Sequence, residues 1–309
     1  RWDGLQRVHI WLTKYLNVPM SQYSSTAGRY WLVSAVARIR DPGAQADHVL
    51  VLEGPQGAAK TNACKALAVN VDEWFLGHVR DIHNKETAMQ LRGKWVVEFA
   101  ELSGLKRAEV ESIKAFFTTH TDAYVPKYKN IEVKAKRQCV FMATVNEDQY
   151  LSDPSGNRRF WPVKVGEIDI DQLRADVDQL WAEAQMIYSS AVVCDGCVNG
   201  KRCKDHRWWP DQDEQESLFS GQQRARMTED AWREPVMLYM RGLANLGKAE
   251  SAAQILTGAL VIPPGDITEA LHGRMTRLLR SCGIKRKERP VSGTLESVTT
   301  WYLDKDDTP

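Results

Sequence analysis

The stretch from residue 54 to 61 reads GPQGAAKT, and its residue types and spacing could bind a chain of phosphates. In the pattern G-x-x-x-x-G-K-[ST], glycines let backbone N–H groups converge on phosphate oxygens at the start of a helix. Lys60 would pair with the β- and γ-phosphates, and the hydroxyl of Thr61 would bind Mg²⁺. The sequence therefore predicts an ATP-binding segment made of Gly54, Pro55, Gln56, Gly57, Ala58, Ala59, Lys60 and Thr61.

Ala59 stands where the pattern has its last glycine. If the backbone there keeps a negative φ, the alanine costs little. If φ has to be positive, the alanine costs on the order of 1–2 kcal/mol. The sequence leaves three possibilities open: a working nucleotide site, a weakened one, or a glycine-rich turn with a solvated lysine.

Carboxylates should follow a neighbouring strand, because a bound metal ion and the attacking water both need them. The run KWVVEFAEL supplies Glu98 and Glu101. We expect Glu98 to bind Mg²⁺ and Glu101 to act as the base, although the roles could be exchanged and Glu98 could simply end a strand. Asn146, which ends the run RQCVFMATVN, could hydrogen-bond to water or to the γ-phosphate.

Arg158 and Arg159, in the run SGNRRFWPV, are further candidates for contact with phosphate. A fixed guanidinium aimed at a γ-phosphate accelerates hydrolysis by several orders of magnitude. Such a residue can come from a neighbouring subunit, which would make the active form a ring. A solvated turn is the alternative interpretation.

Short, buried strands must position these side chains. The runs at residues 48–53, 94–102 and 137–146 are apolar and rich in β-branched residues, and a helical pattern at 107–118 separates the last two. This alternation predicts an α/β fold with a mostly parallel sheet covered by helices. Helical spacing also predicts helices over 5–16, 29–40 and 170–188.

The bulk composition excludes several classes of protein. The 309 residues are 43% hydrophobic and 26% charged, and no apolar run approaches the length of about 18 residues that a membrane span needs. Without a signal-peptide pattern, we expect a cytoplasmic protein without a membrane partner. Because the formal net charge is +1, any affinity for DNA must come from local basic patches.

Four stretches resemble the virulence-associated E family: WDGLQRVHIWLTKYL, LVLEGPQGAAKT, WVVEFAELSGLKRAEVESIKAFFT and VFMATVNEDQYLSDPSGNRRFWPV. The resemblance covers residues 2 to about 190. It implies an ATPase core similar to superfamily 3 helicases of the AAA+ class, in a replication protein of a phage or genomic island in a bacterial host cell. It also implies a homo-oligomeric ring, expected to be a hexamer, and an N-terminal primase-like region in the same chain or as a partner.

The resemblance assigns roles to residues at matching positions. Gly54, Gly57, Lys60 and Thr61 would be the phosphate loop, and Glu98 and Glu101 the acidic motif. Asn146 would be the first sensor, and Arg158 or Arg159 the finger that contacts a neighbour's nucleotide. The family's loop normally has glycine at the position of Ala59.

A hairpin before the sensor strand is also implied, because superfamily 3 helicases use such a hairpin to grip single-stranded DNA in a central pore. The run YVPKYKNIEVKAKRQCVF fits that place, with Lys127, Tyr128 and Lys129 at the expected tip. The tyrosine could stack on a base or touch a sugar. A solvated strand edge carrying scattered lysines is the alternative.

The run CDGCVNGKRCKDH has the spacing of a metal site. Its ligands would be Cys194, Cys197, Cys203 and His206, in the order C-x₂-C-x₅-C-x₂-H, which can enclose one tetrahedral Zn²⁺ in a closed, structural site. We expect zinc to hold the linker between the core and the C-terminal unit, with KDHRWWP docked against it. Free surface thiols or a redox pair are the alternatives.

The C-terminal part resembles a winged helix, with helices followed by a hairpin around residues 292–293. Asp266 could cap the second helix. The basic side chains expected to contact phosphates, on duplex DNA, are Arg274, Arg277, Lys285, Arg286 and Lys287. A helical cap with a solvated basic face is the alternative.

We therefore expect four parts: a helical N-terminal part at 1–45, an AAA+ type P-loop ATPase core at 46–190, a cysteine-rich zinc linker at 191–225, and a winged-helix-like domain at 226–309. The leading function is a ring-forming DNA motor driven by Mg²⁺ and ATP. The alternative is a DNA-binding initiation factor with a degenerate nucleotide site. A scaffold that contacts proteins would show no salt-sensitive DNA binding.

Overall fold

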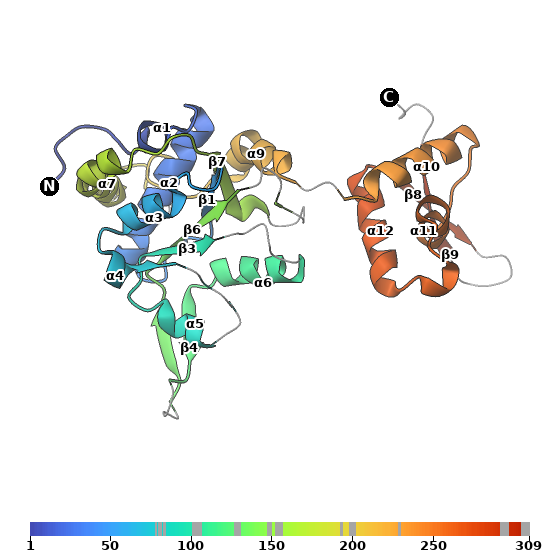
Figure 1. Ribbon diagram of the computed structural model, residues 1–309, viewed down its shortest axis with the longest axis horizontal. Coiled ribbons are helices and arrows are strands. Elements are labelled where there is room, and N and C mark those ends of the chain that lie inside the picture. The colour runs from blue at the N-terminus through green and yellow to red at the C-terminus, as the bar shows by residue number, and fades with distance from the viewer. Residues whose placement is uncertain are drawn as a thin grey trace. The chain divides into compact units, whose positions relative to one another are not determined.

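The computed structural model describes residues 1–77, 79, 82, 85–100, 107–126, 131–146, 150–151, 157–191, 194–197, 202–227, 230–290 and 297–303. The chain forms two compact units, Arg1–Thr228 and Glu229–Pro309. Figure 1 shows the elements of both.

A parallel sheet forms the centre of the first unit. Its five strands lie in the order β2–β3–β6–β1–β7. Their bounds are Phe75–Leu76 (β2), Val96–Ala100 (β3), Val140–Val145 (β6), Val49–Glu53 (β1) and Phe160–Lys164 (β7). The predicted parallel sheet is confirmed, and the three apolar runs form its three inner strands.

Helices cover both faces of this sheet, because alternate residues of each strand point in opposite directions. In β1, Leu50 and Leu52 join one hydrophobic core, whereas Val49 and Val51 join the other. The first core is closed by α1 (Trp11–Leu16), α2 (Gln22–Arg40), α3 (Lys60–Ala68) and α7 (Ile170–Ser190). The second is closed by α6 (Arg107–Phe117), on the opposite side of the sheet in Figure 1.

Two short helices precede strands of the sheet, α4 (Val71–Trp74) before β2 and α5 (Lys85–Gln90) before β3. An antiparallel hairpin, β4 (Thr121–Tyr124) and β5 (Val133–Lys136), precedes β6. The expected hairpin is therefore present. Its expected tip residues Lys127, Tyr128 and Lys129 lie outside the described residues.

The segment after the cysteines is not the irregular linker that its polar composition indicates. It forms α8 (Gln212–Glu214), a π-helical turn (η4, Gln215–Phe219) and α9 (Ser220–Ala225), which belong to the first unit. Phe219 is completely buried between Tyr23 and Trp161, at ring-centroid distances of 5.2 and 5.3 Å. A single buried aromatic side chain thus docks a segment whose other residues are mostly polar.

The second unit consists of α10 (Arg233–Asn245), α11 (Ala252–Leu260), α12 (Glu269–Ser281) and the antiparallel hairpin of β8 (Lys285–Pro290) and β9 (Ser297–Tyr302). Its core includes Met240, Ile255, Leu279 and Trp301. The expected hairpin is confirmed, although its turn lies outside the described residues. The expected Asp266 cap is wrong: this residue lies in a 3₁₀ turn, and the Thr268 hydroxyl caps α12 instead.

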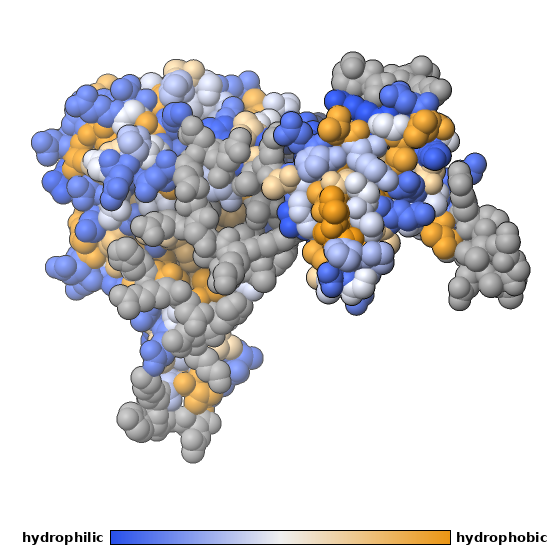
Figure 2. Space-filling view, turned by 45° about the vertical axis from the view of Figure 1, so that its right-hand side comes forward, coloured by the Kyte–Doolittle hydropathy of each residue, from blue (hydrophilic) through white to orange (hydrophobic). Residues whose placement is uncertain are grey.

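The surface mixes polar and apolar residues. Figure 2 shows hydrophobic residues interspersed with hydrophilic ones on the visible faces of both units. Singly exposed apolar side chains, such as Leu238 and Val261, are ordinary features of protein surfaces. Within the described residues, no helix combines the length and the apolar character that a membrane span requires.

Candidate nucleotide and metal sites

The candidate phosphate loop lies at the carboxyl edge of the sheet, between β1 and α3. The buried strand β1 ends at Glu53, and α3 begins at Lys60. Gly57 turns the loop with a φ of 84°. Ligands of open parallel sheets bind at the carboxyl ends of the strands, and helix N-termini favour anions. The predicted order of strand, loop and helix is present, and the loop ends at the N-terminus of α3.

The Lys60 ammonium is held inside this loop, and the residue as a whole is 7% exposed. Its Nζ donates to the carbonyl oxygens of Gly54 and Pro55, at 2.6 and 2.8 Å, and to Asn146 Oδ1 at 3.0 Å. These bonds use all three of its donors. Burial lowers the pKa of Lys60, and the nearby Glu98 carboxylate partly opposes this shift. A phosphate oxygen would bind Lys60 by replacing one of these neutral acceptors.

Two hydroxyl groups and one carboxylate meet beside the loop. Thr61 Oγ1 donates to Glu98 Oε1 at 2.7 Å, and Thr144 Oγ1 donates to the same oxygen at 3.1 Å. Glu98 lies on β3 and is 2% exposed. A hydroxyl and a carboxylate are the hard oxygen ligands that Mg²⁺ prefers. The structure thus brings Lys60, Thr61, Glu98 and Asn146 together, while Glu101 lies outside the described residues.

Ala59 adopts the left-handed backbone conformation, with φ of 56° and ψ of 22°. The loop therefore has the shape that a glycine at this position would allow, and the alanine bears the strain, on the order of 1–2 kcal/mol. Its carbonyl still accepts the first bond of the helix, from the Ala63 N–H at 3.0 Å. The positive φ at Ala59 therefore carries a cost in stability.

A buried ion pair lies directly behind the loop. Both oxygens of Glu53 accept bonds of 2.8 Å from the Arg226 guanidinium, and Oε1 also accepts one of 2.9 Å from the Tyr150 hydroxyl. Glu53 is 1% exposed. Sequence reasoning missed Arg226. The available signal was a glutamate ending an apolar strand, since a buried carboxylate requires a partner.

Arg158 and Arg159 lie at the opposite edge of the sheet. They end a 3₁₀ turn that leads into β7, whose first residue, Phe160, pairs with Val49 at the start of β1. The strands separate the two edges by roughly 13 Å. Burial and the positive charges of both arginines lower the pKa of His48, just before β1, to about 3. Within one chain, these arginines do not meet the loop.

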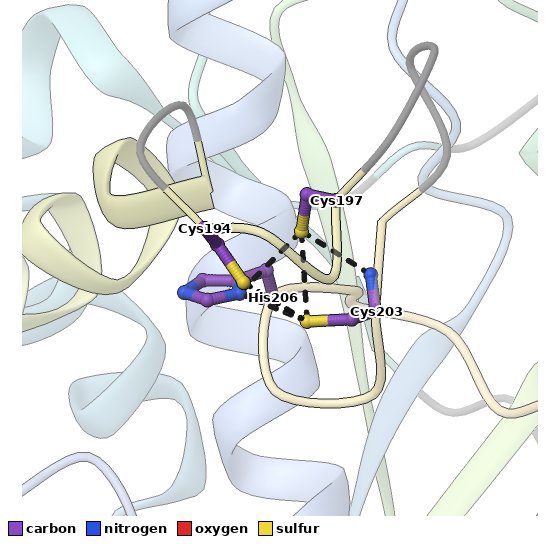
Figure 3. Close-up of side chains that lie close together, drawn as sticks. All are labelled: Cys194, Cys197, Cys203 and His206. Atoms are coloured by element: carbon purple, nitrogen blue, oxygen red, sulfur yellow. Dashed lines mark hydrogen bonds between the residues drawn. The ribbon is translucent and has the colours of Figure 1, made fainter.

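The four predicted metal ligands converge, with all ligand atoms within 4.8 Å of one another (Figure 3). Cys203 Sγ lies 3.7 Å from Cys194 Sγ and 3.5 Å from Cys197 Sγ, and His206 Nδ1 lies 3.1 Å from Cys203 Sγ. A tetrahedral ion with metal–sulfur bonds of about 2.3 Å separates its sulfurs by roughly 3.8 Å. The cluster could therefore hold a metal ion.

Local backbone geometry and a neighbouring hydroxyl prepare this cluster. The Cys203 N–H points to Cys197 Sγ at 3.3 Å, and a Cβ on Gly196 would lie 3.3 Å from the Cβ of Cys203. The His206 imidazole lowers the pKa of Cys203 to about 6, which favours the thiolate that metals bind. His206 Nε2 lies 2.9 Å from Ser190 Oγ, which orients the ring.

The cysteine segment docks on the first unit. Arg29 donates to the carbonyls of Lys204 and Asp205, and the Trp208 indole donates to the Gln45 carbonyl at 2.6 Å. The Arg202 guanidinium lies over the rings of Tyr188 and Trp208. The described contacts attach the segment to α2, α7 and the loop after α2. The hypothesis that zinc holds the linker between the core and the C-terminal unit stays a prediction.

A sequence model of the virulence-associated protein E-like domain matches residues 1–229. The chain belongs to this family. The match includes the phosphate loop and also the cysteine cluster, beyond residue 190, where the resemblance was expected to end. The comparison with curated proteins gives no match.

Two solved structures of the NrS-1 C-terminal region (305-718) are similar to the chain. The apo structure is 12% identical with a TM-score of 0.51, and the A form of the apo structure is 13% identical with a TM-score of 0.53. Each alignment covers 98% of this chain and 76% of the other. At such low identity, the likeness to these structures shows a shared fold.

The basic residues of the second unit that are predicted to contact DNA phosphates differ in their surroundings. Arg274 donates to both carboxylate oxygens of Asp230 and stacks over the Trp232 ring, 3.8 Å from its centroid. Its charge is thus paired within the unit. The other four, which are Arg277, Lys285, Arg286 and Lys287, have exposed side chains.

Replacing Ala59 by glycine should stabilise the protein. Glycine relieves a positive-φ strain of about 1–2 kcal/mol, and its larger entropy in the unfolded chain offsets roughly half of this. We expect the thermal unfolding midpoint, measured by calorimetry, to rise by about 1–3 °C.

Ala58→Gly is the matched control, because Ala58 is not among the residues with positive φ. This change adds freedom to the unfolded chain without relieving strain, so the midpoint should fall. Equal effects of the two substitutions would contradict the left-handed conformation of Ala59.

Proposed function

We propose that this chain is a Mg²⁺-dependent ATPase. It would use ATP hydrolysis to move along or unwind DNA during replication of a phage or another mobile element. The convergence of Lys60, Thr61, Glu98 and Asn146 carries this proposal. Lys60 and the loop N–H groups would bind the phosphates, and Thr61 and Glu98 would hold Mg²⁺. The bound ion would neutralise negative charge on the phosphates.

The strand order supports an AAA+ core. Since β6 lies between β1 and β3, Asn146 at its end stands between the phosphate loop and Glu98. From there its amide would orient the attacking water or the γ-phosphate. Glu101 remains our proposed base, because in the sequence it comes directly after β3, the strand that carries Glu98. As the water oxygen bonds to the γ-phosphorus, the bond from that phosphorus to the β–γ bridging oxygen would break and ADP would leave, while the base takes the proton from the water.

The placement of Arg158 and Arg159 supports action between subunits. They lie at the edge of the sheet away from their own loop, so a finger role requires the loop of a neighbouring subunit. Repeating this contact head to tail closes a ring. We propose a hexamer. Of the two, Arg158 is exposed and hence accessible to a neighbour.

DNA would be bound in two places. The tip of the β4–β5 hairpin, with Lys127, Tyr128 and Lys129, would grip single-stranded DNA in the pore. The second unit, whose three helices and hairpin fit a winged helix, would contact duplex DNA through Arg277 and the exposed cations of β8. A primase-like region in the same chain or in a partner would complete the replication machinery.

The cysteine cluster would hold one structural Zn²⁺. Three thiolates and one imidazole fill a tetrahedral shell, which leaves no position for a substrate. Zinc at this point would fix the segment that carries α8 and α9 to α2, and thereby support the Arg226–Glu53 pair behind the phosphate loop.

A second candidate is a DNA-binding initiation factor that hydrolyses ATP weakly or not at all. The strained Ala59 favours it, since the family's loop normally has glycine there. Lys60 also has three protein acceptors, which compete with phosphate for its donors. The two candidates differ in whether the chain turns over ATP.

Lys60→Ala should lower the rate of phosphate release from Mg²⁺-ATP by about 100- to 1,000-fold, because it removes a positive charge at the transferred phosphoryl group. Release is measured with and without single-stranded DNA. Lys65→Ala, on the same helix but outside the loop, is the control and should retain activity. A parent protein that binds DNA but releases no phosphate would support the second candidate.

Subunits carrying Arg158→Ala and subunits carrying Lys60→Ala should each be inactive alone and regain activity when mixed. In an equal mixture, about a quarter of head-to-tail interfaces combine an intact loop with an intact finger. The measurement is phosphate release against mixing ratio, repeated with Arg159→Ala. Absence of recovery for both arginines would refute a finger acting between subunits.

Elemental analysis should find one zinc ion per chain, and Cys203→Ala should remove it. Loss of a structural zinc costs about 3 kcal/mol or more. The unfolding midpoint should therefore fall by roughly 6–12 °C. Cys282→Ala, in the second unit, is the control and should keep both the zinc and the midpoint. A folded parent without zinc would refute the metal assignment.

A further inference from the structure

A cavity of about 510 Å³ opens at the amino edge of the sheet, away from the phosphate loop. Its lining includes Trp95 and Gln138, which precede β3 and β6, and Arg40 at the end of α2. Its volume falls in the range of about 300–1,000 Å³ that small-molecule sites occupy. Neither the sequence patterns nor the nucleotide site accounts for this cavity.

Three tryptophans form an aromatic wall of the cavity. The ring centroids of Trp95 and Trp181 are 4.3 Å apart, and Trp74 meets Trp95 edge to face at 6.2 Å. The indole N–H groups of Trp95 and Trp181 donate to backbone carbonyls, at 3.0 and 3.1 Å. These two rings are therefore fixed. Trp74 is 39% exposed, so part of its surface is available for stacking.

The cavity also carries positive charge. Arg40 and Lys94 are among its lining residues, and the described residues of the lining include no aspartate or glutamate. Arg40 Nε donates to Gln185 Oε1 at 2.5 Å, and Lys94 Nζ donates to the Asp72 carbonyl at 3.1 Å. Both acceptors are neutral, so neither bond cancels the charge. Flat aromatic surface beside two cations, neither of which has an ion-pair partner in the part of the chain that the structure describes, complements a nucleobase with its phosphate.

The position of the cavity indicates the source of this ligand. Gln138 lies two residues after the end of β5, so the cavity and the base of the β4–β5 hairpin share one edge of the sheet. We propose that the cavity binds one nucleotide of single-stranded DNA, with the base stacked on Trp74 and the phosphate between Arg40 and Lys94. The proposal rests on the DNA-binding part of the proposed function and not on ATP turnover.

The first experiment measures binding of a fluorescently labelled ten-nucleotide oligodeoxythymidylate to the full chain by anisotropy. Trp74→Ala should weaken binding by about 5- to 100-fold, the usual effect of removing one stacking aromatic. Arg40→Gln should weaken binding and reduce its dependence on salt. The matched controls are Trp2→Ala and Arg92→Gln, which change the same residue types outside the cavity. Thermal unfolding of each variant verifies the fold.

A direct experiment places 5-iododeoxyuridine in the oligonucleotide and irradiates the complex, which links the base to an aromatic ring stacked on it. Mass spectrometry should find the adduct on Trp74 or Trp95. Adducts confined to other residues, or equal affinity losses for Trp74→Ala and Trp2→Ala, would overturn the proposal. If thymidine monophosphate blocks the adduct at concentrations below those of the oligonucleotide, the site takes free nucleotides and the DNA assignment is wrong.

The test of the cavity and the test of the proposed ATP-driven motor can give different results. A chain without DNA-stimulated ATPase activity that still gives the Trp74 adduct would refute the motor and support the cavity. A chain with normal DNA-stimulated activity and no adduct at the cavity would refute the cavity alone.

Discussion

The ammonium group of Lys60 joins the candidate phosphate loop to the end of a neighbouring strand. A buried ammonium is tolerated only where several acceptors surround it. The acceptors here are two carbonyls of the preceding loop and the amide of Asn146, which ends a different strand. The loop shape, the left-handed Ala59 and the length of β6 are all parts of one arrangement that surrounds this group. The Glu98 carboxylate supports the same charge from β3.

All strands of the parallel sheet run in the same direction, so the sheet has a carboxyl edge and an amino edge. The two edges carry different functional groups. The carboxyl edge carries the hydroxyls, the carboxylate and the ammonium. The amino edge carries the arginine pair, the base of the hairpin and the tryptophan cavity. A single chain cannot use both edges on one ligand, because the strands keep them apart. In a head-to-tail assembly, by contrast, the edge of one subunit faces the other edge of its neighbour.

Much of this arrangement follows from local patterns in the sequence. Short apolar runs predicted the inner strands. The positions of Lys60 after the first run, Glu98 within the second and Asn146 at the end of the third indicated the grouping that the structure shows. The cysteine spacing predicted a cluster that the structure brings together. Such features can be read from the sequence because residues close together in the chain determine where a strand ends and how two nearby ligands are spaced.

The features that sequence reasoning missed depend on contacts between distant residues. Arg226 pairs with Glu53 across 173 positions, and the tryptophans of the cavity come from three separate helices and loops. The helices at 212–225 were missed because few apolar residues anchor them: Phe219 is buried in the core, Leu218 packs against it, and buried polar side chains such as Gln223 bond to distant residues. The expected Asp266 cap failed because threonine, two residues later, offered the same kind of oxygen at the true helix start. The sign of φ at Ala59 could be established only from coordinates.

The Arg226–Glu53 pair has a consequence for the strand that precedes the phosphate loop. Arg226 lies four residues before Asp230, where the described part of the second unit begins, and its partner is the last residue of the strand that carries the phosphate loop. Met227, the residue after Arg226, is also bridged to Leu151 of the first unit. Removing one partner of a buried ion pair costs about 3–5 kcal/mol, because it leaves the other charge buried and unpaired. Loss of the Arg226 guanidinium would therefore destabilise the end of β1, directly before the phosphate loop.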